Sequence, residues 1–335
     1  MSGSAEVRTL AYGDPGTAAF EQLSGVFREP VPAGSECRLA LRDGGAVARC
    51  SSVLVEGLHG ADGWTGLIGH FEARDQAAAL AVLADARGAL FARGAARVLA
   101  PMNGSTWKRY RLALPREPGE PAFDPPVFAG EPANPETYPA WFAAAGATVV
   151  ARYESRIDET PAVLAADARA LAGRVREAGI RVRALDAGAF ESELALLHEL
   201  SLESFAGNLY YSPIAREEFR AQYEAMRRGL DPGLVLIAES RSGTPIAFQF
   251  AYLDPIATAA GRPPRAIVKT VATAPAARGM GLAGHMLDLL RERAAERGAT
   301  AVIHALMHVA NFSMRMSARH EARVFRRYAL YEWRP

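Results

Sequence analysis

Apolar and polar residues in the C-terminal half follow the spacing expected of an ordered series of strands and helices. Apolar runs bounded by turn residues predict strands at 180–185, 234–238, 245–253, 266–274, 300–307 and 324–333. Leu194, Leu197 and Leu200 recur on one helical face and predict a helix over 190–205. Further helices are predicted at 212–228, at 282–297 and after Asn311, with a loop at 254–264.

A glycine-rich run joins the predicted strand 266–274 to the predicted helix 282–297, and it reads Arg278-Gly279-Met280-Gly281-Leu282-Ala283-Gly284. Glycine lets the backbone approach a ligand closely and adopt a left-handed conformation. The first amides of a helix lack partners within the helix, and the helix dipole is positive at that end. The run therefore predicts a site for phosphate oxygens.

Three interpretations of this run are open. Gly279, Gly281 and Gly284 satisfy the dinucleotide fingerprint G-x-G-x-x-G. That interpretation needs an acidic residue about 20 residues further on, and it needs several more βα units. The segment 300–307 holds no carboxylate, and the chain after it is too short for those units. A helix that uses glycines only for its cap is the second interpretation.

The third interpretation rests on Arg278-x-x-Gly281-x-Ala283, which resembles the acetyl-coenzyme A pyrophosphate loop of the GNAT acetyltransferase superfamily. The order of elements across the C-terminal half resembles the same fold. The resemblance implies that acetyl-CoA is the co-substrate and that no metal is needed. It assigns cofactor binding to strand amides, to the loop and to one asparagine: Val271, Ala272, Thr273, Arg278, Gly279, Met280, Gly281, Leu282, Ala283, Gly284 and Asn311. An ordinary helix N-cap is the alternative role of Asn311.

The N-terminal half carries a fainter copy of the C-terminal pattern. Residues 93–99 resemble 297–303 at an offset of 204, which also matches 64–68 to 268–272. At that offset Asp75 replaces Gly279 and Ala77 replaces Gly281, so the first copy is expected to have lost phosphate binding. Chance similarity between two alanine-rich helices is the alternative.

The chain as a whole resembles bacterial tandem-GNAT proteins. The expected fold class is α+β, with two tandem GNAT-like domains, each a mixed, mostly antiparallel twisted sheet flanked by helices. We expect a degenerate domain at 1–155, a linker helix at 156–178 and an acetyl-CoA-binding domain at 179–335.

The amino-acid composition limits the partners and the cellular compartment that we expect for the protein. The 335 residues carry a net charge of +1, so no strong field attracts nucleic acid or a membrane surface. Cys37 and Cys50 are the only cysteines, which fits a reducing compartment, and the first residues lack a signal-peptide core. We therefore expect a cytoplasmic monomer or homodimer that acts on a small-molecule amine, with no nucleic-acid or membrane partner.

The catalytic candidates are Glu203, His304 and Ser317, with His308 as a further possible base. Residues of these types more often have a structural role, solvated or hydrogen-bonded, than a catalytic one. His304 and His308 lack a third ligand nearby, which argues against a metal site. Many GNAT members carry a tyrosine acid seven residues after the asparagine, but this chain has Ala318 there, next to Ser317.

The resemblance predicts transfer of an acetyl group from acetyl-CoA to an amine by direct attack. Two alternatives are open: an aminoacyl or other acyl transferase of the same fold, and a non-catalytic protein that binds coenzyme A or a partner.

Overall fold

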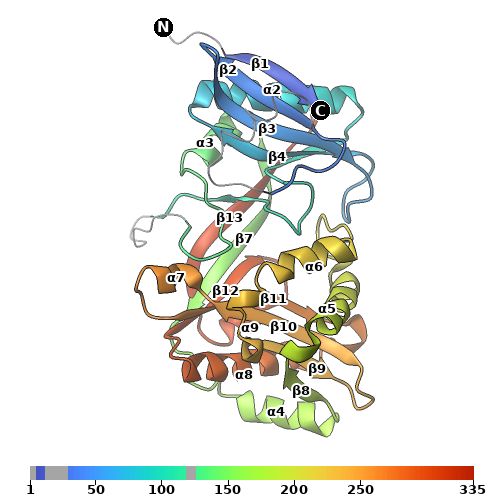
Figure 1. Cartoon of the computed structure of the whole chain (residues 1–335), viewed down its shortest axis with the longest axis vertical. Helices are drawn as coiled ribbons and strands as arrows, with labels where there is room; N and C mark the ends of the chain where they lie inside the picture. Colours follow the sequence, from blue (N-terminus) through green and yellow to red (C-terminus); the bar gives the residue numbers. More distant parts are fainter. Residues whose placement is uncertain (1–4, 12–28, 118–125) are drawn as a thin grey trace.

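The computed structural model describes residues 5–11, 29–117 and 126–335, and Figure 1 shows their arrangement. One sheet runs through the whole molecule, with helices on its faces. Its strands, within these residues, are β1 (Glu6–Ala11), β2 (Glu36–Arg42), β3 (Gly45–Val55), β4 (Thr65–Ala73), β5 (Arg97–Ala100), β6 (Leu112–Ala113), β7 (Thr148–Asp158), β8 (Arg181–Ala184), β9 (Val235–Glu239), β10 (Pro245–Leu253), β11 (Arg265–Thr273), β12 (Ala301–His308) and β13 (Arg323–Trp333).

The helices are shared between the two halves of the chain. They are α2 (Gln76–Ala92), α3 (Tyr138–Ala144), α4 (Ala168–Glu177), α5 (Phe190–Phe205), α6 (Arg216–Glu224), α7 (Pro255–Ala259), α8 (Leu282–Glu296) and α9 (Ser313–Ala318). Most predicted elements are confirmed to within a few residues. The predicted loop at 254–264 contains α7, and the helix predicted over 212–228 is shorter because Pro213 and the segment before Arg216 are not helical.

The strand order of the sheet is β1-β2-β3-β4-β5-β13-β7-β12-β11-β10-β9-β8, with β6 paired to β13. Neighbouring strands are antiparallel except for two pairs, β4 with β5 and β11 with β12. Each parallel pair is connected by a long helix, α2 in the first case and α8 in the second. The two halves therefore repeat one topology in mirrored order about the sheet centre.

The last strand of each half lies in the other half of the sheet. β7, which ends the N-terminal half, pairs with β12, while the C-terminal strand β13 pairs with β5. β7 and β13 also pair with each other from Arg323↔Ile157 to Glu332↔Thr148, at the centre of the molecule (Figure 1). The two expected sheets are thus joined into one, and β7 runs through the expected boundary between residues 155 and 156.

The expected linker helix is largely wrong. Ile157 and Asp158 belong to β7, and a helix forms only over α4, residues Ala168–Glu177. The end of β7 pairs with both β12 and β13, as Ile157 does with Ile303 and Arg323, and this tertiary pairing overrides the local helix propensity there.

The registers of the two parallel pairs correct the alignment of the halves. Thr65 pairs with Arg97 in the first half, and Arg265 pairs with Ala301 in the second. The strands before the two helices therefore align at an offset of 200, not at the 204 that relates β5 to β12. The N-terminal half has only Arg74 and Asp75 between strand and helix, where the C-terminal half has its longer glycine-rich run.

Helices cover both faces of the C-terminal part of the sheet. Leu236 and Ala238 of β9 pack in the cluster that includes α8 and Met316 of α9. Their alternating neighbours Val235 and Ile237 pack in the cluster of α5 and α6. Since successive side chains of a strand point to opposite faces, α8 and α9 lie on one face and α5 and α6 on the other.

Candidate functional site

A cavity of about 460 Å³ lies where β11 and β12 separate. The two strands pair in parallel from Arg265↔Ala301 to Val268↔His304, and no pairing continues beyond that point. The strand residues that line the cavity come next in sequence: Val268, Lys269, Thr270 and Val271 of β11, and His304, Ala305, Leu306, Met307 and His308 of β12.

The cavity extends to both faces of the sheet. Met316 of α9 lines it on the face of α8, whereas Phe205, the last residue of α5, and Tyr211, between α5 and α6, line it from the other side. A ligand in the cavity can therefore be approached from both faces, through a gap in which the main-chain groups of β11 have no β12 partner. Strand amides of this kind are fixed hydrogen-bond donors.

The N-terminal half supplies part of the wall. The segment that follows β5 contributes Trp107, whose ring lies edge-on to Phe205, Tyr211 and Phe219 with centroids 5.9, 6.0 and 6.0 Å away. Its indole Nε1 donates to the Ser212 carbonyl at 2.9 Å. The aromatic residues of 205–212 therefore pack against a residue from the other half.

Main-chain hydrogen bonds also attach this wall to the N-terminal half. The amide of Tyr210 donates to the carbonyl of His59 at 2.8 Å, and the amide of His59 donates to the carbonyl of Tyr211 at 3.0 Å. Arg97 donates to the Tyr210 hydroxyl at 3.4 Å. The first half thus fixes the segment between α5 and α6, in addition to forming its own core.

Two titratable groups in the wall have altered proton affinities. Tyr211 is 7% exposed, its hydroxyl has no hydrogen-bond partner among the described residues, and burial raises the pKa of the phenol. His308 is partly buried, and burial, followed by the charge of Arg111, lowers the pKa of its imidazole. Near neutral pH the phenol is therefore protonated and the imidazole uncharged.

The glycine-rich run forms a turn with two left-handed residues, Gly279 at φ 82° and Gly281 at φ 84°. Gly281 is the N-cap of α8 and supplies no side-chain cap. Within the described part of the chain, the amides from Gly279 to Gly284 have no hydrogen-bond acceptor. This end of α8 has the free donors that an anion needs.

The two left-handed glycines differ in the space around them. A Cβ atom at Gly281 would clash with Leu171 Cδ1 of α4, so a side chain there would displace Leu171 as well as strain the left-handed backbone. A Cβ at Gly279 would meet nothing within 4 Å. The open side of the loop is therefore at Gly279. Arg278 is tied to α5, because its Nη2 donates to the Ser204 carbonyl at 2.9 Å.

The N-terminal half differs both at the start of its long helix, α2, and at the gap between its parallel strands, β4 and β5. Only Arg74 and Asp75 separate β4 from α2, and the Asp75 carboxylate accepts the Ala78 amide at 2.9 Å as a helix cap. Asn103 fills the gap between β4 and β5, where its Oδ1 accepts the amide of His70 at 2.7 Å. A Cβ at Gly69 would lie 2.5 Å from the Met102 carbonyl oxygen, so this gap is closed.

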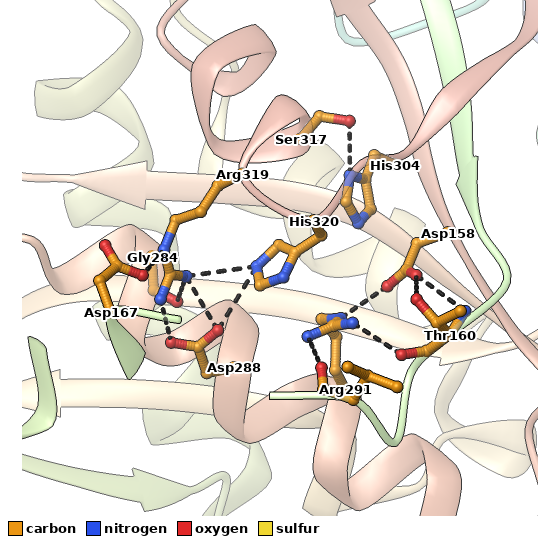
Figure 2. Close-up of polar contacts among 11 residues, drawn as sticks. Asp158, Thr160, Asp167, Gly284, Asp288, Arg291, His304, Ser317, Arg319 and His320 are labelled. Atoms are coloured by element: carbon orange, nitrogen blue, oxygen red, sulfur yellow. Dashed lines mark hydrogen bonds and ion pairs between the residues drawn. The ribbon is translucent and has the colours of Figure 1, made fainter. Parts of the chain in front are cut away.

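Two of the predicted catalytic residues, His304 and Ser317, contact each other in a buried polar cluster beside α8. His304 Nδ1 and Ser317 Oγ are 2.8 Å apart, and burial lowers the pKa of His304 to about 4. Figure 2 shows the rest of the cluster, in which Arg291 donates to Asp158 at 2.6 Å. Arg319 donates to both oxygens of Asp288 and to Asp167, joining α9, α8 and the residue before α4.

The structure brings only some of the predicted site residues to the cavity. Val271, His304 and Asn311 line it; Ala272, Thr273, the loop 278–284, Glu203 and Ser317 do not. Glu203 is exposed on α5. Asn311 is not the N-cap of α9, which begins after Phe312, and its side chain has no partner among the described residues. The roles assigned to these residues remain predictions.

Sequence reasoning left open whether the first half contributes to the site, and it named none of the residues that do. The segment Thr106-Trp107-Lys108-Arg109-Tyr110-Arg111 lines the cavity throughout, and its density of aromatic and cationic residues was the available signal. Among the described residues no group of His, Cys, Asp and Glu side chains is arranged to hold a metal ion. None of the helices in the described segments combines the length and apolar character needed to span a membrane.

Residues 196–318 match the model of the acetyltransferase (GNAT) family. This match covers α5 to α9 and includes the glycine-rich run and most of the cavity's strand wall. No curated protein matches the chain.

Solved structures share the fold at low identity. The chain is similar to a GCN5-related N-acetyltransferase from Sphaerobacter thermophilus, with 17% identity, a TM-score of 0.51 and coverage of 92% of this chain and 84% of that one. It is similar to a tandem GNAT protein from the clavulanic acid biosynthesis pathway, with 15% identity, a TM-score of 0.54 and 98% coverage of both.

A third similar structure is the glucosamine N-acetyltransferase region of a fungal multi-domain GH3 β-N-acetylglucosaminidase, with 15% identity and a TM-score of 0.56. That match covers 98% of this chain but only 38% of the fungal chain, so this chain spans well under half its length. At these identities the likenesses establish the α+β fold.

Proposed function

The chain carries a domain of the GNAT acetyltransferase family at residues 196–318, and we propose that it transfers an acetyl group from acetyl-CoA to the amine of a small molecule. The observation that carries the proposal is that two features lie next to each other, one at β11 and the other directly after it. A helix whose first amides lack acceptors follows β11, and β11 itself separates from β12 to form a cavity.

Each feature suits one part of the co-substrate. The free amides of Gly279–Gly284 and the positive end of α8 suit the diphosphate. The unpaired edge of β11 near Val271 offers main-chain donors to a thioester carbonyl, and Asn311 offers an amide to the pantetheine arm. The thioester supplies an activated acetyl group, and the residues around it bind and orient the two reactants.

The reaction that we propose is a direct transfer. The neutral amine attacks the thioester carbonyl carbon, the C–N bond forms, the C–S bond breaks, and the thiolate of coenzyme A leaves. The nitrogen releases its surplus proton to solvent, and solvent returns a proton to the acid that protonates the thiolate. We assign Tyr211 as the donor of a proton to this thiolate, because its hydroxyl is buried, lacks a partner among the described residues and keeps its proton near neutral pH. This assignment replaces the tyrosine missing at Ala318.

We also propose that the N-terminal half has no coenzyme A site of its own. The Asp75 carboxylate occupies the amides of α2 that a phosphate would need, and Asn103 occupies the strand gap. Its contribution to catalysis is then the Trp107 wall and the attachment of the segment between α5 and α6.

Ligand-induced stabilisation tests the proposed function directly. Acetyl-CoA and coenzyme A should raise the melting temperature of the full chain, and NAD should not, because only a ligand of the native state stabilises it. Amine-dependent release of coenzyme A across an amine panel would then establish transfer. Stabilisation by NAD alone, or by none of the three, would refute the proposal. If the Tyr211→Phe variant binds acetyl-CoA but releases no coenzyme A with an amine that the wild type acetylates, the result would support the role of the phenol.

A further inference from the structure

The cationic side chains that line the cavity differ in whether a carboxylate pairs with them. Lys108 and Arg109 are both paired with carboxylates. Lys108 Nζ lies 3.0 Å from Glu218 Oε1, and Arg109 Nε lies 3.5 Å from Glu29 Oε1. These two cations are therefore already compensated within the protein, and among the described residues that line the cavity Glu29 is the only one with a carboxylate.

Arg111 lines the same cavity without such compensation. It is 9% exposed, and its guanidinium lies over the rings of Tyr110 and Tyr153, with Cζ 3.8 and 4.3 Å from the centroids. Nη1 donates to the Leu306 carbonyl at 2.9 Å and Nε to the Tyr110 carbonyl at 3.0 Å. No carboxylate pairs with it among the residues that the structure describes. A buried guanidinium with only neutral partners is costly unless an anion joins it.

A second uncompensated cation comes from the other half of the chain. Lys269 lies on β11 at the point where the strand has left β12, and it lines the cavity. Its side chain is exposed, and its Nζ contacts the hydroxyl of Tyr223, at 3.3 Å, and the face of the same ring. In the described segments it has no carboxylate partner either. The cavity therefore carries two positive charges in excess, one from each half.

We propose that the acceptor is an amine that also bears an anionic group, a carboxylate or a phosphate, and that Arg111 and Lys269 bind this group. The inference rests on the proposed function and names its substrate class. The cations are not needed for the co-substrate, because the phosphates are assigned to the loop 278–284, which does not line the cavity, and the pantetheine arm is neutral. The planar fork of Arg111, held by two carbonyls and two rings, suits an oxyanion.

Matched pairs of amines test this inference. L-phenylalanine is compared with phenethylamine, and O-phosphoethanolamine with ethanolamine, each titrated calorimetrically into the full chain saturated with coenzyme A. The anionic member of at least one pair should bind more tightly to the wild type. Arg111→Gln should weaken that member by roughly 10- to 100-fold and leave the neutral member unchanged, as expected for a charge-assisted hydrogen bond. The two pairs separate carboxylate from phosphate recognition.

Three further variants sharpen the result. Lys269→Gln should also weaken the anionic member, and Arg111→Lys, which keeps the charge but loses the fork, should restore only part of the affinity. Arg216→Gln, which removes an exposed cation paired with Glu199 outside the cavity, is the matched control and should change nothing. Equal binding of both members in every pair, or an anion preference that survives Arg111→Gln, would overturn the inference.

Failure of the inference is distinguishable from failure of the proposed function. Arg111→Gln should keep the full thermal shift with acetyl-CoA, since Arg111 is not assigned to the co-substrate. If the wild type itself shows no such shift, the proposed function fails. If the shift is present and the anionic amines show no preference, the substrate class alone is wrong.

Discussion

His304 Nδ1 lies 2.8 Å from Ser317 Oγ, and the two side chains are 1% and 0% exposed. One residue comes from β12 and the other from α9, so this contact joins the strand wall of the cavity to the helix that follows it. Figure 2 shows that the imidazole belongs to a polar cluster that includes Asp158 and Arg291. Asp158 raises and Arg291 lowers the proton affinity of His304, but burial has the largest effect.

The buried imidazole predicts a loss of stability in mild acid. The pKa of His304 is lowered to about 4 in the native state, against about 6.5 in an unfolded chain. Between these values the unfolded chain binds the extra proton, so the free energy of unfolding falls as pH falls from 6.5 toward 4. One such histidine contributes a slope of up to about 1.4 kcal/mol per pH unit. Urea unfolding at pH 6.5 and pH 5 measures the slope.

The variant His304→Asn isolates this contribution. Asparagine keeps a polar partner for Ser317 but does not titrate, so the slope between pH 6.5 and 5 should decrease relative to the wild type. The remaining slope should come from the other buried histidines, His70 and His320, whose pKa values burial also lowers, to about 4 and about 3. An unchanged slope would show that His304 is not the buried neutral base described here.

The ion pair between Asp158 and Arg291 predicts a large effect of removing one partner. Both side chains are nearly fully buried, at 1% and 3% exposure, with Oδ2 and Nε 2.6 Å apart. Asp158→Asn should lower the free energy of unfolding by about 3–5 kcal/mol, because it leaves a buried guanidinium uncompensated. The neighbouring exposed pair is the control: Glu159→Gln, opposite Arg323, should cost less than about 1 kcal/mol. Equal effects would contradict the burial assigned to Asp158.

Much of the C-terminal half was predictable from its sequence, whereas the junction between the halves was not. Sequence signals were strong where local sequence alone determines the secondary structure. The helix Phe190–Phe205 and the strand Pro245–Leu253 form as predicted. The exchange of β7 and β13 depends on pairing between residues about 180 positions apart, such as Ala151↔Leu330, for which the local pattern contains no information.

The candidate site likewise has a part that was predictable from local sequence and a part that was not. The glycine-rich run was visible because glycines at left-handed φ and an uncapped helix start leave a local signature. The cavity wall from Trp107 and Arg111 left only a weak signal, a density of aromatic and cationic residues, since it forms only when the first half packs against the segment between α5 and α6. His304 and Ser317 were singled out separately, but their contact required the fold of α9 over β12.

The position of Trp107 predicts a selective defect in acceptor use. Trp107→Ala should raise the KM for the acceptor and leave coenzyme A affinity unchanged, because the ring contacts Phe205 and Tyr211 but no part of the loop 278–284. It should also cost roughly 2–4 kcal/mol of stability through the space it leaves. Trp107→Phe, which keeps a ring and loses the bond to Ser212, should have a smaller effect on both. A loss of coenzyme A affinity in Trp107→Ala would contradict this division of the site.

The cap on α2 predicts a purely structural role for Asp75. Asp75→Ala removes the acceptor for the Ala78 amide and the partner of Arg42, and it should lower the free energy of unfolding by about 1 kcal/mol. The affinity and stoichiometry for coenzyme A should stay the same, because Asn103 still closes the strand gap. Calorimetric detection of a second coenzyme A site in this variant would show that the carboxylate alone had blocked the first half.

The most direct measurement of the central claim compares Gly279→Asp with Gly279→Asn for acetyl-CoA affinity. Both residues tolerate left-handed backbone and are nearly equal in size, and a Cβ at this position meets no atom within 4 Å. They differ in one negative charge beside the free amides of α8. If these amides bind the diphosphate, the aspartate variant should bind acetyl-CoA much more weakly than the asparagine variant, at equal fold stability. Equal affinity of the two variants would place the co-substrate elsewhere on the protein.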